Sequence, residues 1–256
     1  MPPAVESTPD RGALLVTGGG RGIGAATAIL AAQRGYAVAV NYLRNATAAE
    51  GVVREITQAG GRARAIAGDV ASEADVLRMF EATAALGPVT GLVNNAGILE
   101  RQCRVDEMDA DRFTRVFATN ITGAFLCARE AVRRMSTRHG GRGGAIVNVS
   151  SMAATLGSPG EYVDYAASKG AIDSMTIGLA REVAQEGIRV NAVRPGVIYT
   201  DIHASGGEAG RVDRVKAAVP MRRGGEPDEV ARAILWLLSD EASYSTGTFI
   251  DVSGGR

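Results

Sequence analysis

Tyr165 and Lys169 are separated by four positions in a stretch typical of a helix, and Ser151 stands 14 positions before the tyrosine. Residues at i and i+4 share one helix face, so the ammonium would lie one turn from the phenol. A nearby cation favours the ionised phenol and lowers its pKa from about 10 toward neutral pH. Such a phenol passes a proton to a carbonyl oxygen or takes one from an alcohol, and a serine hydroxyl at a strand end would hold the same oxygen. The alternative is a partly buried tyrosine beside a solvated lysine, because Tyr-x-x-x-Lys often arises by chance.

A second group of residues suited to chemistry is the glycine-rich loop 18–24, which includes Gly20, Arg21 and Ile23. The apolar run 13–17 before it predicts a buried strand, and the alanine-rich stretch after it predicts a helix to about residue 33. This order forms a cradle for nucleotide phosphates, because glycines allow close backbone approach and the helix N-terminus offers free N–H groups. The spacing, Thr17-Gly18-x-x-x-Gly22-x-Gly24, differs from G-x-G-x-x-G. The flanking strand and helix still favour a nucleotide site over a flexible turn without a ligand.

The end of the next predicted strand, 37–41, bears on the choice between NAD and NADP. A site for NAD usually has a carboxylate there, which accepts from the ribose 2′-hydroxyl. Here Asn41 and Arg44 occupy this end, and Arg21 lies inside the glycine loop. Guanidinium groups hold a 2′-phosphate that a carboxylate would repel, so the sequence favours NADP(H) over NAD(H). A solvated loop charge is the alternative interpretation of Arg44.

The composition indicates one globular domain over residues 1–256 and argues against several classes of protein. The chain has 28 basic and 28 acidic side chains and a formal net charge of zero, so it offers no charge block for nucleic acid or an anionic membrane. No apolar run reaches the roughly 18 residues of a membrane helix. Residues 1–11 lack the features of a signal peptide and are expected to be a disordered extension. Cys103 and Cys127 are expected to be reduced thiols of a cytoplasmic protein, and no cluster has the spacing of a metal site.

Strand-like apolar runs alternate with helix-like stretches along the whole chain. Further strands are predicted near 62–68, 91–93, 144–149, 188–193 and 247–252, and helices near 46–59, 72–86, 109–138, in the segment carrying Tyr165 to about 186, and at 227–239. This alternation predicts an α/β fold, a doubly wound parallel sheet of about seven strands with helices on both faces. Ligands of such folds bind beyond the carboxyl ends of the strands, where these motifs stand.

With these motifs, the chain resembles the short-chain dehydrogenase/reductase family over about residues 13–256. The matching motifs are Thr17-Gly18-x-x-x-Gly22-x-Gly24, Asp69-Val70, Asn94-Asn95-Ala96-Gly97, Asn120, Ser151, Tyr165-x-x-x-Lys169 and Pro195-Gly196-x-x-x-Thr200. The resemblance implies a Rossmann-like enzyme that uses NADP(H) and transfers a hydride between the nicotinamide and a carbonyl or secondary alcohol. Because cells keep NADP largely reduced, carbonyl reduction is the expected direction.

The resemblance also implies roles for individual residues. Tyr165 would be the general acid and base, Lys169 would lower its pKa and hold the nicotinamide ribose, and Ser151 would bind the substrate oxygen. Asn120 would fix a water that links the lysine to solvent, and it is equally read as a buried asparagine bonded to backbone. The residues expected to bind the cofactor are Thr17, Gly18, Gly20, Arg21, Gly22, Ile23, Gly24, Asn41, Arg44, Asp69, Val70, Asn95, Ala96, Gly97, Tyr165, Lys169, Pro195, Gly196, Ile198 and Thr200.

One spacing departs from the family's pattern. The usual gap of 13 positions between serine and tyrosine falls here on Met152. We expect Ser151 to keep the role, because the turn-rich loop 157–164 is able to absorb one extra residue. Strand alternation points Ser150 the other way, and Tyr162 lies two helical turns from the lysine, outside the pattern.

The polar, glycine-containing stretch 199–226 is expected to be a mobile lid over the substrate. Its composition favours a polar substrate, such as a sugar or an acidic ketone, over a steroid-like one. His203 within it is expected to be a solvated loop histidine rather than a substrate contact. The segment 100–102, Glu100-Arg101-Gln102, is either part of the pocket or surface charge.

Two other functions stay open on the sequence alone. One is an NAD-dependent sugar dehydrogenase of the glucose type, against which Arg21 and Arg44 argue. The other is a non-catalytic NADP(H)-binding sensor, which would be expected to lose the tyrosine or the lysine that this chain keeps. The resemblance further implies a homotetramer or homodimer, and the apolar segment 249–256 is suited to burial between subunits.

Overall fold

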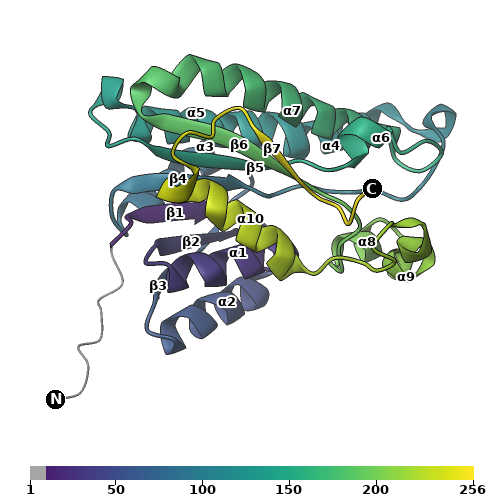
Figure 1. The fold of residues 1–256 in the computed structure, drawn as a ribbon, viewed down its shortest axis with the longest axis horizontal. Coiled ribbons are helices and arrows are strands. Elements are labelled where there is room, and N and C mark those ends of the chain that lie inside the picture. The colour runs from purple at the N-terminus through teal and green to yellow at the C-terminus, as the bar shows by residue number, and fades with distance from the viewer. Residues whose placement is uncertain (1–9) are drawn as a thin grey trace.

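The computed structural model describes residues 10–256 and contains one sheet of seven parallel strands in the order β3-β2-β1-β4-β5-β6-β7 (Figure 1). The strands are β1 (Ala13–Val16), β2 (Ala37–Tyr42), β3 (Arg62–Ala67), β4 (Val89–Asn94), β5 (Gly144–Val149), β6 (Ile188–Pro195) and β7 (Phe249–Val252). The chain starts in the middle of the sheet and winds outward in both directions, so the strand order reverses between β1 and β4. Such a reversal opens a crevice at the carboxyl ends of the strands.

Helices cover both faces of the sheet, which confirms the predicted Rossmann-like α/β fold. The α-helices are α1 (Gly22–Gln33), α2 (Ala46–Gln58), α3 (Glu73–Ala84), α4 (Ala110–Phe117), α5 (Gly123–Met135), α6 (Ala153–Leu156), α7 (Val163–Val183), α8 (Ile202–Ser205), α9 (Arg211–Val215) and α10 (Pro227–Leu238). Short 3₁₀ turns occupy Val105–Glu107, Thr137–His139, Ala184–Glu186, Lys216–Ala218 and Asp240–Ala242, and a π-helical turn occupies Ala118–Thr122. In Figure 1, α1, α2 and α10 lie on one side of the sheet and α3, α4, α5 and α7 on the other.

The central strands are apolar throughout because both of their faces are buried. Along β1, Leu14 and Val16 pack into the core beneath α1 and α10, which includes Ile234. Leu15 points the opposite way, into the core that contains Phe80 of α3. Successive strand residues alternate between faces, so a strand covered on both sides reads as a continuous apolar run.

The predicted strands and helices agree with the structure to within a few residues, with one exception. The helix expected over 109–138 is instead α4, the π-helical turn and α5, and α5 ends at Met135. The helix stops there because Ser136 adopts an extended conformation. The short helices α6, α8 and α9 were not predicted. Ser72 caps α3 as expected, accepting from the amide of Asp75.

The N-terminal extension is only partly covered by the structure. Of the extension expected over residues 1–11, the first nine residues lie outside the described part of the chain. Arg11 is ordered against the body, since its amide donates to the carbonyl of Gly35 at 3.2 Å. Across residues 10–256, no helix combines the length and the apolar character needed to cross a bilayer.

Candidate active site

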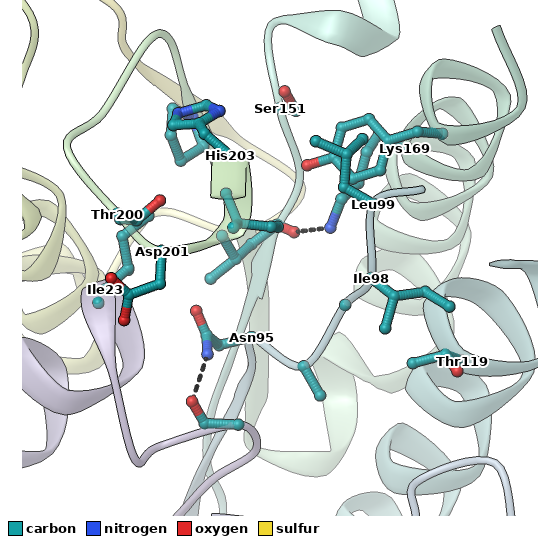
Figure 2. Close-up of a pocket in the computed structure, with 18 of the residues that line it drawn as sticks. Ile23, Asn95, Ile98, Leu99, Thr119, Ser151, Lys169, Thr200, Asp201 and His203 are labelled. Atoms are coloured by element: carbon teal, nitrogen blue, oxygen red, sulfur yellow. Dashed lines mark hydrogen bonds between the residues drawn. The ribbon is translucent and has the colours of Figure 1, made fainter. Parts of the chain in front are cut away.

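A cleft of about 1220 Å³ runs along the carboxyl ends of the strands, from the glycine loop to the segment 199–203. Nineteen of the predicted site residues line it, namely Gly18, Gly20, Arg21, Gly22, Ile23, Asn41, Arg44, Asp69, Val70, Asn95, Ala96, Gly97, Ser151, Tyr165, Lys169, Pro195, Gly196, Ile198 and Thr200. In Figure 2, Ile23, Thr200 and Asp201 gather at one end, with Ser151 and Lys169 farther along. Thr17, Gly24 and Asn120 stand behind this surface.

The glycine loop leads into the N-terminus of α1, as a phosphate cradle requires. Gly18 and Gly22 have φ angles of +61° and +52°, which side chains other than glycine rarely adopt. A Cβ atom on Gly24 would overlap the carbonyl oxygen of Gly18, so the turn closes only with glycine at this position. The cradle therefore has the shape and the free N–H groups that a pyrophosphate needs.

Three polar side chains hold this loop in place through hydrogen bonds. Thr17 is buried, and its hydroxyl accepts from the amides of Asn95 and Ala96, each at 3.0 Å. The side-chain nitrogen of Asn95 donates to the carbonyls of Thr17 and Gly18, and Figure 2 draws one hydrogen bond from the labelled Asn95 side chain. Asn41, also buried, accepts from the Gly18 amide at 3.1 Å and donates to the Gly68 carbonyl at 3.0 Å. These bonds make Thr17 and Asn41 parts of the loop's support.

The cleft beside the end of β2 is basic. Arg21 and Arg44 are exposed and line the cleft. Neither forms an ion pair with any residue of the described chain, and no carboxylate occupies the end of β2. Free guanidinium groups at this edge provide the donors that a phosphate group accepts.

Tyr165 and Lys169 lie on one face of α7, and Ser151 follows β5. The Lys169 ammonium is 5.5 Å from the centre of the Tyr165 ring. It donates to the carbonyl of Val149 at 2.8 Å, which anchors the lysine to the end of β5 (Figure 2). The side chains of the proposed acid and of the cation therefore meet at the strand end, as the spacing predicted.

Burial, and not the neighbouring cation, controls the acidity of the phenol in this structure. Burial raises the pKa of Tyr165 to about 12, and the Ser151 hydroxyl partly opposes this rise. Burial also lowers the pKa of Lys169 to about 8, partly opposed by Asp173. The expected lowering of the phenol pKa is therefore not found, because desolvation is the largest influence on the pKa of each group. At neutral pH the phenol is protonated and the lysine is charged.

The serines at the end of β5 point in opposite directions, as expected from strand alternation. The Ser151 hydroxyl faces the cleft and accepts from the Ala153 amide at 3.1 Å. The Ser150 hydroxyl is buried and donates to a carboxylate oxygen of Asp173 at 2.6 Å. Between Ser151 and Tyr165, the loop after α6 takes left-handed conformations at residues that include Ser158, with a φ of 47°. The loop is thus tightly turned, and its holding of the one residue that is extra relative to the usual spacing stays a prediction.

Asn120 lies in the π-helical turn Ala118–Thr122 and is buried. Its side chain accepts from the Ile98 amide at 2.8 Å and donates to the Ile98 carbonyl at 3.0 Å and to the Ser168 hydroxyl at 3.1 Å. The asparagine thus joins the segment after β4 to α7, in agreement with the backbone-bonded interpretation. π-Helical turns often occur at functional sites.

Comparison with known proteins identifies the family to which the chain belongs. A family model described as Enoyl-(Acyl carrier protein) reductase matches residues 18–256. The chain belongs to the short-chain dehydrogenase/reductase family. It is an oxidoreductase of that family.

Relatives within the family cover nearly the whole chain. The chain is 63% identical over 243 residues to "Uncharacterized oxidoreductase YgfF" of Escherichia coli K12, covering 94% of this chain and 98% of that protein. It is 38% identical over 243 residues to the 3-oxoacyl-[acyl-carrier-protein] reductase of a Synechocystis species, covering 94% of this chain and 95% of that protein. A short-chain dehydrogenase structure from Burkholderia cenocepacia in complex with NADP superposes with a TM-score of 0.88 at 32% identity, covering 97% of this chain and 99% of that one.

Several residues of the cleft were missed by sequence reasoning, or were interpreted differently. Tyr162, set aside as lying outside the family's pattern, is buried and lines the cleft. Its ring meets that of Tyr165 edge to face, with the ring centres 6.3 Å apart. Tyr162 stands three positions before Tyr165 but is the non-helical residue that precedes α7, so helical spacing did not indicate this contact. Leu99, Glu161 and Arg211 also line the cleft but belong to no motif.

His203 is not the solvated loop histidine that the sequence suggested. Its ring is packed into the structure, and Nε2 lies 3.0 Å from the carbonyl oxygen of Ile198. Because a carbonyl only accepts, Nε2 carries the proton and Nδ1 is left as an acceptor. Nδ1 is buried and has no partner within the described chain. Burial also lowers the pKa of His203, so the ring is neutral at pH 7.

The segment expected to be a lid is bonded to the body of the protein. Arg211 donates to Glu161 at 2.8 Å and lies over the ring of Tyr162, 5.0 Å from its centre. Gln102 donates to Glu208 of the same segment at 2.7 Å. The segment 100–102 is therefore divided between the two interpretations. Gln102 contacts the lid, and Glu100 pairs with Arg115, which lines the cleft. Arg101 is exposed. The bonds from Arg211 hold the lid segment against the part of the cleft wall formed by Glu161 and Tyr162.

Proposed function

We propose that this protein reduces a carbonyl group with NADPH, and that Tyr165 donates the proton. The observation that carries the proposal is the meeting of Tyr165, Lys169 and Ser151 in the same cleft as a glycine-rich phosphate cradle. When bound, the nicotinamide supplies the hydride. The chain's own residues bind the substrate oxygen, supply the proton and exclude water.

Each of the three residues has a distinct part in the proposed proton transfer. The Ser151 hydroxyl binds the substrate oxygen and holds it beside the phenol. The Tyr165 Oη gives its proton to that oxygen as negative charge develops there. The Lys169 ammonium, anchored on the Val149 carbonyl, stabilises the phenolate that remains.

The protonation states favour reduction over oxidation. Burial raises the pKa of Tyr165 to about 12, so at neutral pH the phenol carries the proton that it would donate. Alcohol oxidation needs the phenolate as a base, and this form is scarce at that pH. The same site would therefore reduce ketones more readily than it oxidises alcohols.

NADP(H) is the cofactor that the residues fit best. The cradle shaped by Gly24 and the N-terminus of α1 suits a pyrophosphate. Arg21 and Arg44 have no ion-pair partner among residues 10–256 and line the cleft beside β2, where cations would hold a 2′-phosphate. The related Burkholderia structure contains NADP. An NAD-dependent sugar dehydrogenase is disfavoured because no carboxylate stands at the end of β2.

The substrate half of the cleft favours a neutral, hydrogen-bonding substrate. Arg211 and Glu161 both line it, but they are bonded to each other. Arg115 is likewise paired with Glu100, at 2.8 Å. With these two guanidinium groups compensated, neither is free to attract a carboxylate, whereas hydroxyl and carbonyl partners remain available. We therefore place neutral hydroxyketones and sugars ahead of keto acids.

The assembly and location expected from the family also remain proposals. We expect one domain that forms a homotetramer or homodimer in the cytoplasm. Light scattering coupled to size-exclusion chromatography of the purified chain tests this, and a monomer at micromolar concentration would contradict it.

The test of the function is the loss of NADPH absorbance with a panel of carbonyl compounds. The panel contains hydroxyketones, sugars, keto acids, diketones and 3-oxoacyl thioesters, and NADH is run in parallel. Turnover with at least one neutral carbonyl, faster with NADPH than with NADH, supports the proposal. Tight NADPH binding without turnover of any member would favour the alternative of a non-catalytic sensor.

A further inference from the structure

A buried ion pair lies directly beside the proposed acid. Arg112 of α4 donates from Nε to one carboxylate oxygen of Asp164 at 2.7 Å and from Nη2 to the other at 3.1 Å. The two side chains are 7% and 1% exposed. Asp164 immediately precedes Tyr165 in the first turn of α7. The pair therefore joins α4 to the turn of the helix that carries the phenol.

The remaining guanidinium nitrogen reaches a third segment. Nη1 of Arg112 donates to the carbonyl of Arg101 at 2.6 Å and contacts Sγ of Cys103 at 3.0 Å. The Cys103 amide in turn donates to the Glu161 carbonyl at 3.0 Å, just before α7. One side chain thus holds the segment 101–103 against the start of α7.

This segment continues the wall of the substrate cleft. Ile98 and Leu99 line the cleft, and Asn120 fixes Ile98 from the other end. Leu99 also lies against Gly206 of the lid, where a Cβ atom would come within 2.9 Å of the leucine. The wall is therefore tied at one end by Asn120 and at the other by Arg112.

Stability alone is a poor account of this pair. A buried ion pair loses the hydration of both charges, and replacing such a pair by apolar residues is often neutral or stabilising. The pair instead fixes the orientation of α4 relative to the first turn of α7, because the guanidinium group and the carboxylate are joined by two hydrogen bonds at once. A lysine offers a single point charge and would not also reach the Arg101 carbonyl in this geometry.

We infer that Arg112 and Asp164 are positioning residues, which set the substrate wall 98–103 at the correct distance from the phenol of Tyr165. The inference rests on the proposed function, in which that phenol is the acid. Neither side chain lines the cleft, so both act through the segments that they hold. Misplacement of about 1 Å costs on the order of 100-fold in rate, which sets the scale of the expected effect.

The test compares the parent with Arg112→Lys and with the double variant Arg112→Met/Asp164→Leu, which removes both buried charges. The double variant is expected to fold with an unfolding temperature at or above the parent's and to bind NADPH within twofold of the parent. Its kcat/KM for the carbonyl is expected to fall by about 10- to 100-fold, through both a lower kcat and a higher KM. Arg112→Lys is expected to lose activity in the same way.

The matched control is Arg232→Met/Asp228→Leu on α10, whose side chains are 70% and 60% exposed and lie away from the cleft. It is expected to keep the parent's kcat/KM. A folded double variant at Arg112 and Asp164 with unchanged kcat/KM would overturn the inference, because a merely structural pair would change the unfolding temperature alone.

A second readout does not depend on turnover. Amide hydrogen exchange over residues 98–104 in the NADPH complex is expected to be at least tenfold faster in the double variant than in the parent and the control. Equal exchange rates in this segment would overturn the inference even if no substrate is turned over. A parent without turnover but with the expected exchange difference would reject the proposed function and keep the positioning role.

Discussion

Replacing Lys169 by methionine is expected to stabilise the protein while removing its activity. Burial lowers the pKa of this lysine from 10.5 to about 8. At about 1.4 kcal/mol per pKa unit, the buried ammonium costs about 3 kcal/mol relative to the neutral amine. Methionine also loses the bond to the Val149 carbonyl, which is worth about 1 kcal/mol. The net expectation is a gain of about 2 kcal/mol in the free energy of unfolding at pH 7.

The stability difference between the parent and Lys169→Met depends on pH, because the folded and the unfolded chain lose the Lys169 proton at different pH values. The unfolded chain keeps it to about pH 10.5 and the folded chain only to about pH 8. The cost is therefore fully present below pH 8 and disappears as the pH rises from 8 to 10.5. The advantage of Lys169→Met should accordingly be full at pH 7 and smaller at pH 10.

Urea denaturation of both proteins at pH 7 and at pH 10 measures this difference, and NADPH turnover is followed in parallel. Lys216→Met is the matched control, because Lys216 is the chain's other lysine, and its side chain is 42% exposed and pairs with Asp213. Its substitution should change stability by less than about 1 kcal/mol. A Lys169→Met variant less stable than the parent at pH 7, or an advantage that does not shrink at pH 10, would refute the reasoning.

Three further results are expected at the same site. The double variant Arg21→Ala/Arg44→Ala should raise the Kd for NADPH by about 100-fold, at about 1 to 2 kcal/mol per charge-assisted bond, and leave NADH nearly unaffected; equal losses measured by fluorescence titration would contradict the 2′-phosphate assignment. The rate of reduction should be flat below pH 8 and fall above it as Lys169 loses its proton, whereas oxidation should rise with pH toward the pKa of Tyr165 at about 12; identical profiles in the two directions would argue against this acid. Ser151→Ala should lower kcat by about 100-fold and Ser150→Ala should not, because the Ser150 hydroxyl is turned away toward Asp173; the reverse order in steady-state kinetics would reassign the serine.

The sheet was predictable because its strands are buried on both faces. In β1, β2 and β5, nearly every residue contacts one apolar core or the other, so these strands appear in the sequence as unbroken apolar runs. The glycine loop was predictable for a local reason, since Gly18 and Gly22 have left-handed φ angles and a Cβ atom on Gly24 would overlap the Gly18 carbonyl oxygen. The positions of Tyr165 and Lys169 followed from helical spacing alone.

Other features depend on tertiary contacts that no local pattern reveals. The π-helical turn at Ala118–Thr122 interrupts the α-helical bonding between α4 and α5, although the sequence there favours one continuous helix. The pKa of Tyr165 depends on how far the fold desolvates the phenol, and sequence spacing shows only the nearby cation. His203 stands in a polar segment that looks solvated, and only the folded lid turns its ring inward.

The central claim is that Tyr165 donates the proton, and Tyr165→Phe tests it most directly. The substitution removes the hydroxyl and keeps the ring that packs edge to face against Tyr162, so the protein should fold and bind NADPH as the parent does. On the carbonyl found in the substrate screen, the account predicts that NADPH consumption falls by at least about 1,000-fold while the Kd for NADPH stays within twofold. A Tyr165→Phe protein that consumes NADPH within about tenfold of the parent rate would show that another group supplies the proton and would contradict the account.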